Sequence, residues 1–153
     1  MGRIEDRLVA LGHPLPAVVP PVAAYIPAVV TGNLVMTAGQ LPMVEGKLVE
    51  RGKVPSQVSP ERAKELAQIS ALNALAAVKF AIGDLDRITR IVKVTGFISC
   101  EADFTAHPAI NNGASEFLGQ VFGDAGVHAR TTVGVSSLPL DAPVEVELIV
   151  EFN

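Results

Sequence analysis

Hydrophobic positions change their spacing along the chain, and these changes divide it into helices and strands. Residues 60–82 are rich in Ala and Leu and follow Ser59, which can cap a helix start, while Pro60 and Glu61 suit its first turn. Gly83 ends the run, so we expect one long helix. One side of that helix is small enough to lie close against a sheet, because alanines recur along it: Ala63, Ala67, Ala71, Ala74, Ala77 and Ala81.

Runs of β-branched and apolar residues predict five strands: 22–30, 33–40, 89–99, 131–136 and 144–152. The first two flank the turn sequence Thr31-Gly32-Asn33 and should pair antiparallel. A smaller hairpin at 43–49 should turn at Glu45-Gly46. The last two strands flank a break marked by Pro139, Asp141 and Pro143, and we expect them to form two strands around a turn.

Helical spacing also appears at the N-terminus and before the fourth strand. Residues 1–12 predict a short amphipathic helix, and the prolines that follow predict an extended path over residues 13–22. A second helix of the main domain should begin at Pro108 and end at Gly123. We therefore divide the chain into an N-terminal helix with a proline-rich extension, 1–21, and a single domain, 22–153.

The order of these elements predicts an α+β fold in which a mixed sheet is covered by two helices on one face. Apolar residues fall on both alternations of several strands. A sheet face that is apolar and uncovered needs a partner, so we expect the second face to be buried between subunits of a homo-oligomer.

Composition narrows the function classes. The 153 residues carry a formal net charge of −4 and no basic run, which argues against nucleic-acid binding and against attraction to a membrane surface. Cys100 is the single cysteine, so no internal disulfide can form. We find no signal peptide and no apolar run approaching the ~20 residues of a membrane span, and we expect a cytoplasmic protein.

Arg130 and Glu145 are the leading candidates for chemistry, because each lies where a predicted strand meets a loop. A guanidinium offers a planar fork to a carboxylate or phosphate, and an ionised carboxylate can accept a proton from water. The alternative is a structural ion pair between adjacent strands. Glu147 and Glu151 share the alternation of Glu145, so position alone does not single it out.

Histidine and cysteine give weaker signals. His13, His107 and His128 are isolated, with no ligand spacing for a metal, and we interpret them as surface histidines. Cys100 could act as a nucleophile, although a small core or interface residue is the favoured interpretation.

Two further polar features are candidates for a functional role. Asn111-Asn112-Gly113 lies inside a helical pattern, where amides and glycine cost helix stability, and this local inconsistency indicates function. Tyr25, the only tyrosine, could present its hydroxyl to a cavity or simply pack.

The order of elements and several motifs resemble the RidA/YjgF family of reactive-intermediate deaminases. The motifs are Tyr25, the stretch from Thr31 to Pro42 with Gly39-Gln40, Ala129-Arg130-Thr-Thr-Val133 and Val144-Glu145-Val146. The resemblance implies a chorismate-mutase-like fold and a homotrimer with a central barrel and clefts between subunits. It also implies hydrolysis of 2-imino or 2-enamino acids to 2-keto acids and ammonia, without a cofactor or metal.

Carried over to this chain, the resemblance implies that Arg130 holds the substrate carboxylate and that Glu145 positions or activates the attacking water. Tyr25 and Asn112 would border the cleft. Thr132 stands where many members have cysteine, and its backbone could still bind the ligand; Ala38 replaces a common serine. These two departures motivate an alternative, a non-catalytic protein that binds small carboxylic acids. A ribonuclease role fits the acidic composition poorly.

Overall fold

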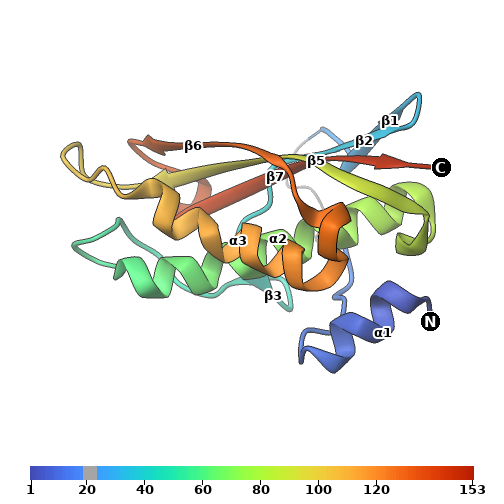
Figure 1. Cartoon of the computed structure of the whole chain (residues 1–153). Coiled ribbons are helices and arrows are strands. Elements are labelled where there is room, and N and C mark those ends of the chain that lie inside the picture. Colours follow the sequence, from blue (N-terminus) through green and yellow to red (C-terminus); the bar gives the residue numbers. More distant parts are fainter. Residues whose placement is uncertain (19–23) are drawn as a thin grey trace.

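The computed structural model describes residues 1–18 and 24–153, and its centre is a five-stranded sheet with helices on one side (Figure 1). The α-helices are α1 (Arg3–Ala10), α2 (Pro60–Ile82) and α3 (His107–Phe122). The strands of the main sheet are β1 (Ala28–Thr31), β2 (Leu34–Thr37), β5 (Ile88–Ser99), β6 (Ala129–Val135) and β7 (Val144–Phe152), and β3 (Met43–Val44) and β4 (Lys47–Leu48) form the predicted small hairpin. Short 3-10 turns lie at Leu85–Arg87, Gly123–Gly126 and Pro139–Asp141.

The strand order is β1-β2-β7-β5-β6, which corrects one expectation. β6 and β7 do not form two strands around a turn, because β5 lies between them, parallel to β6 and antiparallel to β7. The Pro-rich connection, with its 3-10 turn at Pro139–Asp141, carries the chain past the end of β5. The sheet is therefore mixed, as predicted, with β1 and β6 at its edges.

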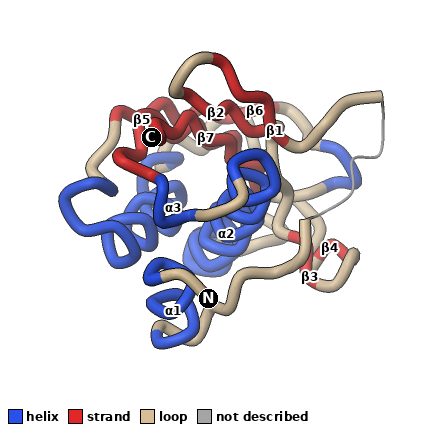
Figure 2. Tube along the Cα trace, turned by 90° about the vertical axis from the view of Figure 1, so that its right-hand side faces the viewer, coloured by secondary structure: helices blue, strands red, loops and turns tan. Residues whose placement is uncertain are grey.

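The predicted long helix forms α2, which packs beside α3 on one face of the sheet (Figures 1 and 2). The side chain of Ser59 accepts a hydrogen bond from the backbone N–H of Arg62, as its capping role requires. Contrary to our expectation from composition, α2 is long and apolar enough to cross a membrane. Most of its residues are buried inside the fold, however, so it is the core helix of a soluble-type domain.

Two residues of the Asn111-Asn112-Gly113 stretch have a packing role that the sequence pattern did not predict. A Cβ on Gly113 would lie 1.9 Å from the backbone oxygen of Lys64, so α3 crosses α2 at a point where only glycine fits. Asn111 is fully buried, and its amide occupies the space that a Cβ on Gly96 would need. Interpreting Asn111 and Gly113 as lacking a packing gain was therefore wrong.

The N-terminal helix α1 packs against the same core as the main domain. Ile4 and Leu8 are buried, and the carboxylate of Asp86 accepts hydrogen bonds from the first backbone N–H groups of the helix. Residues 13–18 have no regular structure, as predicted, and residues 19–22 of the expected extended path lie outside the described residues. β1 begins at Ala28, so residues 24–27 of the predicted first strand are not part of it, since Pro27 cannot donate to a ladder; Val22 and Ala23 lie outside the described residues.

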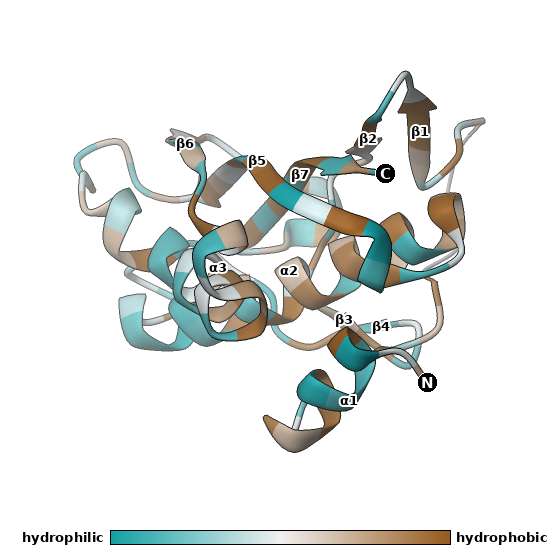
Figure 3. Cartoon of the chain, turned by 45° about the vertical axis from the view of Figure 1, so that its right-hand side comes forward, coloured by the Kyte–Doolittle hydropathy of each residue, from teal (hydrophilic) through white to brown (hydrophobic). Residues whose placement is uncertain are grey.

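The face of the sheet away from α2 and α3 carries apolar residues in register. Val29, Met36 and Ile149 lie side by side across β1, β2 and β7, and Phe97 lies beside Val133 across β5 and β6. Val29 is 51% exposed and Met36 is 42% exposed. Figure 3 shows the hydrophobic colouring of β1. Burial of this open face between subunits stays a prediction.

Candidate functional site

Arg130 lies on the edge strand β6, where its side chain turns toward α3. Its Nη1 donates hydrogen bonds to Asn112 Oδ1 at 2.7 Å and to Ser115 Oγ at 3.3 Å. Both partners are neutral, and within residues 1–18 and 24–153 no carboxylate lies at ion-pair distance from the guanidinium. A half-buried guanidinium oriented by neutral groups keeps donors that can bind a carboxylate in fork geometry.

A second layer of hydrogen bonds holds the groups that orient Arg130. His128 Nδ1 lies 2.6 Å from the carbonyl oxygen of Gly126, and since a carbonyl only accepts, this nitrogen carries the hydrogen. In the neutral ring Nε2 is then an acceptor, so Ser115 Oγ donates to it across 2.8 Å. Ser115 and His128 were not among the predicted site residues, because the contact that joins them to Arg130 is tertiary.

Thr132 lies two residues beyond Arg130 and on the same face of β6. Its Oγ1 is 2.8 Å from Asn111 Nδ2, which donates to it. The hydroxyl is therefore engaged with the buried asparagine, while Thr132 is half-buried beside α3. A ligand at this position would meet a hydroxyl that is already hydrogen-bonded.

Glu145 lies on β7 and packs against the chain at Gly39. A Cβ on Gly39 would lie 2.5 Å from Glu145 Oε2, so the glycine leaves the room that the carboxylate occupies. Burial raises the pKa of Glu145, and the negative charge of Glu147 raises it further. A carboxylate with a raised pKa is a stronger proton acceptor when ionised.

Arg130 and Glu145 lie on opposite faces of the sheet within one protomer. Arg130 pairs with Val94, which pairs with Leu148, and this row faces the helices. Glu145 pairs with Phe97 on the alternate row, which faces the open side. The alternative of a structural ion pair between adjacent strands is therefore wrong: the strands are not adjacent, and the side chains point to different faces.

Tyr25 lies in a bend just before β1 and is 47% exposed. It lies at the opposite edge of the sheet from Arg130, since β1 and β6 are the two edge strands. One protomer therefore brings together Arg130, Asn112 and Thr132 near α3, and separately Glu145 and Gly39 on the open face. The predicted site residues form two half-sites rather than one pocket.

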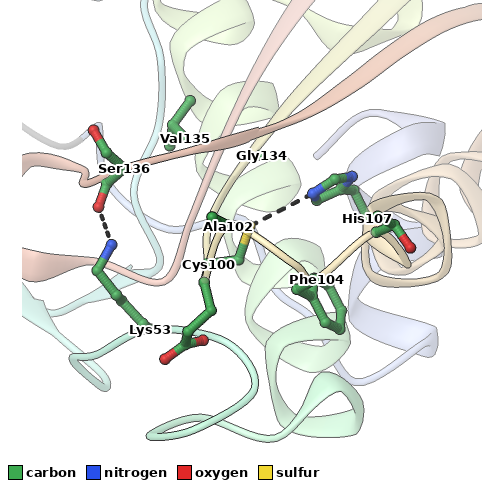
Figure 4. Close-up of a pocket in the computed structure, with 10 residues that line it drawn as sticks. Lys53, Cys100, Ala102, Phe104, His107, Gly134, Val135 and Ser136 are labelled. Atoms are coloured by element: carbon green, nitrogen blue, oxygen red, sulfur yellow. Dashed lines mark hydrogen bonds between the residues drawn. The ribbon is translucent and has the colours of Figure 1, made fainter.

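A cavity of about 580 Å³ lies at the end of β5, beyond the Arg130 half-site (Figure 4). Cys100 Sγ lies on its wall, 3.5 Å from His107 Nε2. The interpretation of the histidines as isolated surface residues is wrong: each is half-buried, His107 contacts the thiol, His128 bonds Ser115, and His13 Nε2 lies 2.7 Å from Gln68 Nε2. Within the described part of the chain, no group of three or more His, Cys, Asp or Glu residues could hold a metal ion.

A family model described as "YjgF/chorismate_mutase-like, putative endoribonuclease" matches residues 5–152. The chain belongs to this family. Protein TCP17 of Trypanosoma cruzi is 36% identical over 153 residues, which cover 99% of this chain and 96% of that protein. The match confirms the resemblance to RidA/YjgF and the chorismate-mutase-like fold.

Solved structures of YjgF-like proteins share the architecture. Protein Atu1372 of Agrobacterium tumefaciens, whose function is unknown, is 42% identical with a TM-score of 0.92, over 98% of this chain and 92% of that one. Escherichia coli TdcF, solved with bound serine, is 26% identical with a TM-score of 0.65, over 89% of this chain and 94% of that one.

Replacing Glu145 with glutamine is expected to stabilise the protein more at about pH 8 than at about pH 4. The folded pKa of Glu145 is raised above its unfolded value, so the folded state binds this proton more tightly. Stability from this group is present at low pH and falls as pH rises through the window between the two values. Melting temperatures of wild type and Glu145→Gln across pH measure the difference.

Glu147→Gln is the companion variant, because it removes the charge that adds to the shift while leaving Glu145 in place. It should give part of the same pH-dependent gain. A constant difference between wild type and Glu145→Gln at all pH values would show that the Glu145 carboxylate is not held in a costly environment.

Proposed function

We propose that this YjgF-family protein hydrolyses small 2-imino or 2-enamino acids to 2-keto acids and ammonia. The observation that carries the proposal is the Arg130 half-site, a guanidinium oriented by Asn112 and Ser115 with no carboxylate partner among the described residues. Such a group suits a substrate whose fixed feature is one carboxylate.

The complete cleft takes Arg130 from one copy of the chain and Glu145 from another. The opposite orientations of the two side chains within one protomer support this arrangement. It is supported by the exposed apolar residues of β1 and β2, which a second copy would cover. A homotrimer with its open sheet faces turned inward would repeat the cleft three times.

The reaction needs orientation and one proton acceptor. With the carboxylate held by Arg130, water attacks the imine carbon, and its proton passes to Glu145. Glu145 returns this proton to the substrate nitrogen, which gives a carbinolamine. Glu145 then takes the hydroxyl proton of the carbinolamine and passes it to the nitrogen as the carbon–nitrogen bond breaks, so ammonia leaves and the 2-keto acid forms. An enamine enters the same route once its β-carbon is protonated to give the imine. Glu145 suits this role because its raised pKa makes its carboxylate more basic.

A second candidate is a non-catalytic protein that binds small carboxylic acids. Serine, the molecule bound in TdcF, has the carboxylate and nitrogen of an imino acid without its reactive double bond. Thr132 carries no thiol, and its hydroxyl accepts a hydrogen bond from Asn111, so this position adds no nucleophile to the half-site.

RNA cleavage, the activity in the family's description, receives less support from the chain itself. β7 places Glu145, Glu147 and Glu151 on one alternation of the open face. Three carboxylates in a row repel phosphate groups, and the net charge of −4 adds to this.

The decisive assay measures release of 2-keto acid and ammonia from freshly generated 2-aminoacrylate and from a larger imino acid. Wild type should accelerate release, and Arg130→Ala should lose at least about a hundredfold of that acceleration, since misplacing the carboxylate misplaces the reacting carbon. Arg7→Ala removes an exposed arginine of α1 and serves as the matched control. Thermal stabilisation of wild type by serine without any acceleration would move the assignment to the binding protein.

A further inference from the structure

The cavity at the end of β5 lies apart from both half-sites and has no part in the proposed deamination. Gly134, which lines it, lies four residues beyond Arg130 on β6. Its volume of about 580 Å³ accommodates a small organic molecule. Its wall gathers a thiol, an imidazole and an ammonium group beside apolar surface (Figure 4): Lys53, Cys100, Glu101, Phe104, His107 and Val135.

The thiol and the imidazole are a nucleophile and a proton acceptor in contact. Cys100 Sγ lies 3.5 Å from His107 Nε2, and the ring of His107 packs edge-on against Phe104. A Cβ on Gly134 would lie 2.4 Å from His107 Nε2 and 2.8 Å from Cys100 Sγ. The contact between Cys100 and His107 is therefore possible because residue 134 of β6 is glycine.

The ammonium group of Lys53 lies close enough to Cys100 for its charge to affect the thiol. Lys53 Nζ donates a hydrogen bond to the carbonyl oxygen of Ser136 and keeps two further N–H groups. Glu101, the anion on the cavity wall, is turned toward Ser56, whose hydroxyl donates to its Oε1. Burial raises the pKa of the Cys100 thiol; the charge of Lys53 opposes this rise, and the charge of Glu101 adds to it. A buried thiol that keeps its proton needs a base beside it to react, and His107 is that base.

We propose that Cys100 is a covalent modification site for small unsaturated carboxylic acids whose double bond is conjugated with the carboxylate. Lys53 pairs with the carboxylate, and the sulfur of Cys100 forms a bond to the β-carbon of the double bond. The thiol proton passes to His107 Nε2 and from there to the α-carbon. Nothing leaves, so the addition is balanced without an oxidant or a second reactant.

Acrylate and its neutral isostere acrylamide test the proposal on the intact protein. Cys100 is the only cysteine, so one added mass in an intact-mass measurement reports on it, and Cys100→Ser is the blank. With 2-mercaptoethanol as the uncharged free-thiol reference, wild type should show an acrylate-to-acrylamide rate ratio at least about tenfold higher, because a charge-assisted contact holds the carboxylate. A ratio equal to that of 2-mercaptoethanol, or no addition at all, overturns the proposal.

Variants separate the roles of the two neighbours. Lys53→Met should return the ratio to the free-thiol value, and Lys53→Arg should restore most of it. His107→Gln should slow both reagents equally and leave the ratio high, as loss of a proton acceptor requires. Equal ratios in wild type and Lys53→Met would contradict the assignment of Lys53, and circular dichroism confirms that each variant is folded. Deaminase activity is not involved, so failure of the proposed function leaves this test unaffected.

Discussion

Gly113→Ala is expected to destabilise the fold by roughly 2 kcal/mol or more, the largest stability loss that a single added methyl should cause in this chain. Its Cβ would lie 1.9 Å from the backbone oxygen of Lys64, so relief requires α2 and α3 to move apart rather than a side chain to rotate. Their contact is the main helix–helix packing of the domain. The higher helix propensity of alanine, worth about 1 kcal/mol, offsets only part of this cost. Urea unfolding followed by circular dichroism measures the difference.

Gly119→Ala is the matched control, because it makes the same change in the same helix. Gly119 is exposed, and a Cβ there would meet nothing within 4 Å. This variant should gain up to about 1 kcal/mol from helix propensity. If the two variants behave alike, the close crossing at Gly113 does not limit the packing of α3.

The sequence predicts the local elements well because their signals are local. The Ser59 cap, the alanine-rich run and Gly83 define α2 to within a residue, and β-branching defines β5. Strand partners carry no such signal. A break with Pro139 and Pro143 is compatible with a hairpin and with a connection that crosses a third strand. In the structure the connection crosses β5.

The candidate site was predictable in its members but not in its arrangement. Arg130 and Glu145 stood out because each lies at the start of a strand, and family resemblance added Asn112, whose contact with Arg130 the structure shows. That the two charges face opposite sides depends on β5 lying between their strands, which no pattern within either strand encodes. The supporting His128 is likewise joined to the site only through Ser115.

Mixing two inactive variants, Arg130→Ala and Glu145→Gln, is expected to restore activity. Under the proposed function each variant alone should have almost none, because every intersubunit cleft would lack either the carboxylate clamp or the proton acceptor. In a mixed ring, a cleft regains both groups when a chain with intact Arg130 faces a neighbour with intact Glu145. For equal amounts and random assembly this occurs in about a quarter of the clefts. The assay is keto acid release after the two variants are unfolded together and refolded.

The control for this experiment pairs variants from the same half-site. Asn112→Ala and Arg130→Ala both damage the side of the cleft near α3, where Asn112 Oδ1 accepts from the guanidinium. In their mixture, the α3 side of each cleft comes from one variant or the other. A cleft built with the Arg130→Ala chain lacks the guanidinium, and a cleft built with the Asn112→Ala chain lacks the amide that orients it. No cleft has both groups, so activity should not exceed the average of the two variants. If Arg130→Ala and Glu145→Gln also fail to complement although native mass spectrometry shows mixed oligomers, both groups act within one chain or not at all. Since the sheet separates them in one protomer, that result would remove Glu145 from the reaction and leave Arg130 as a binding group.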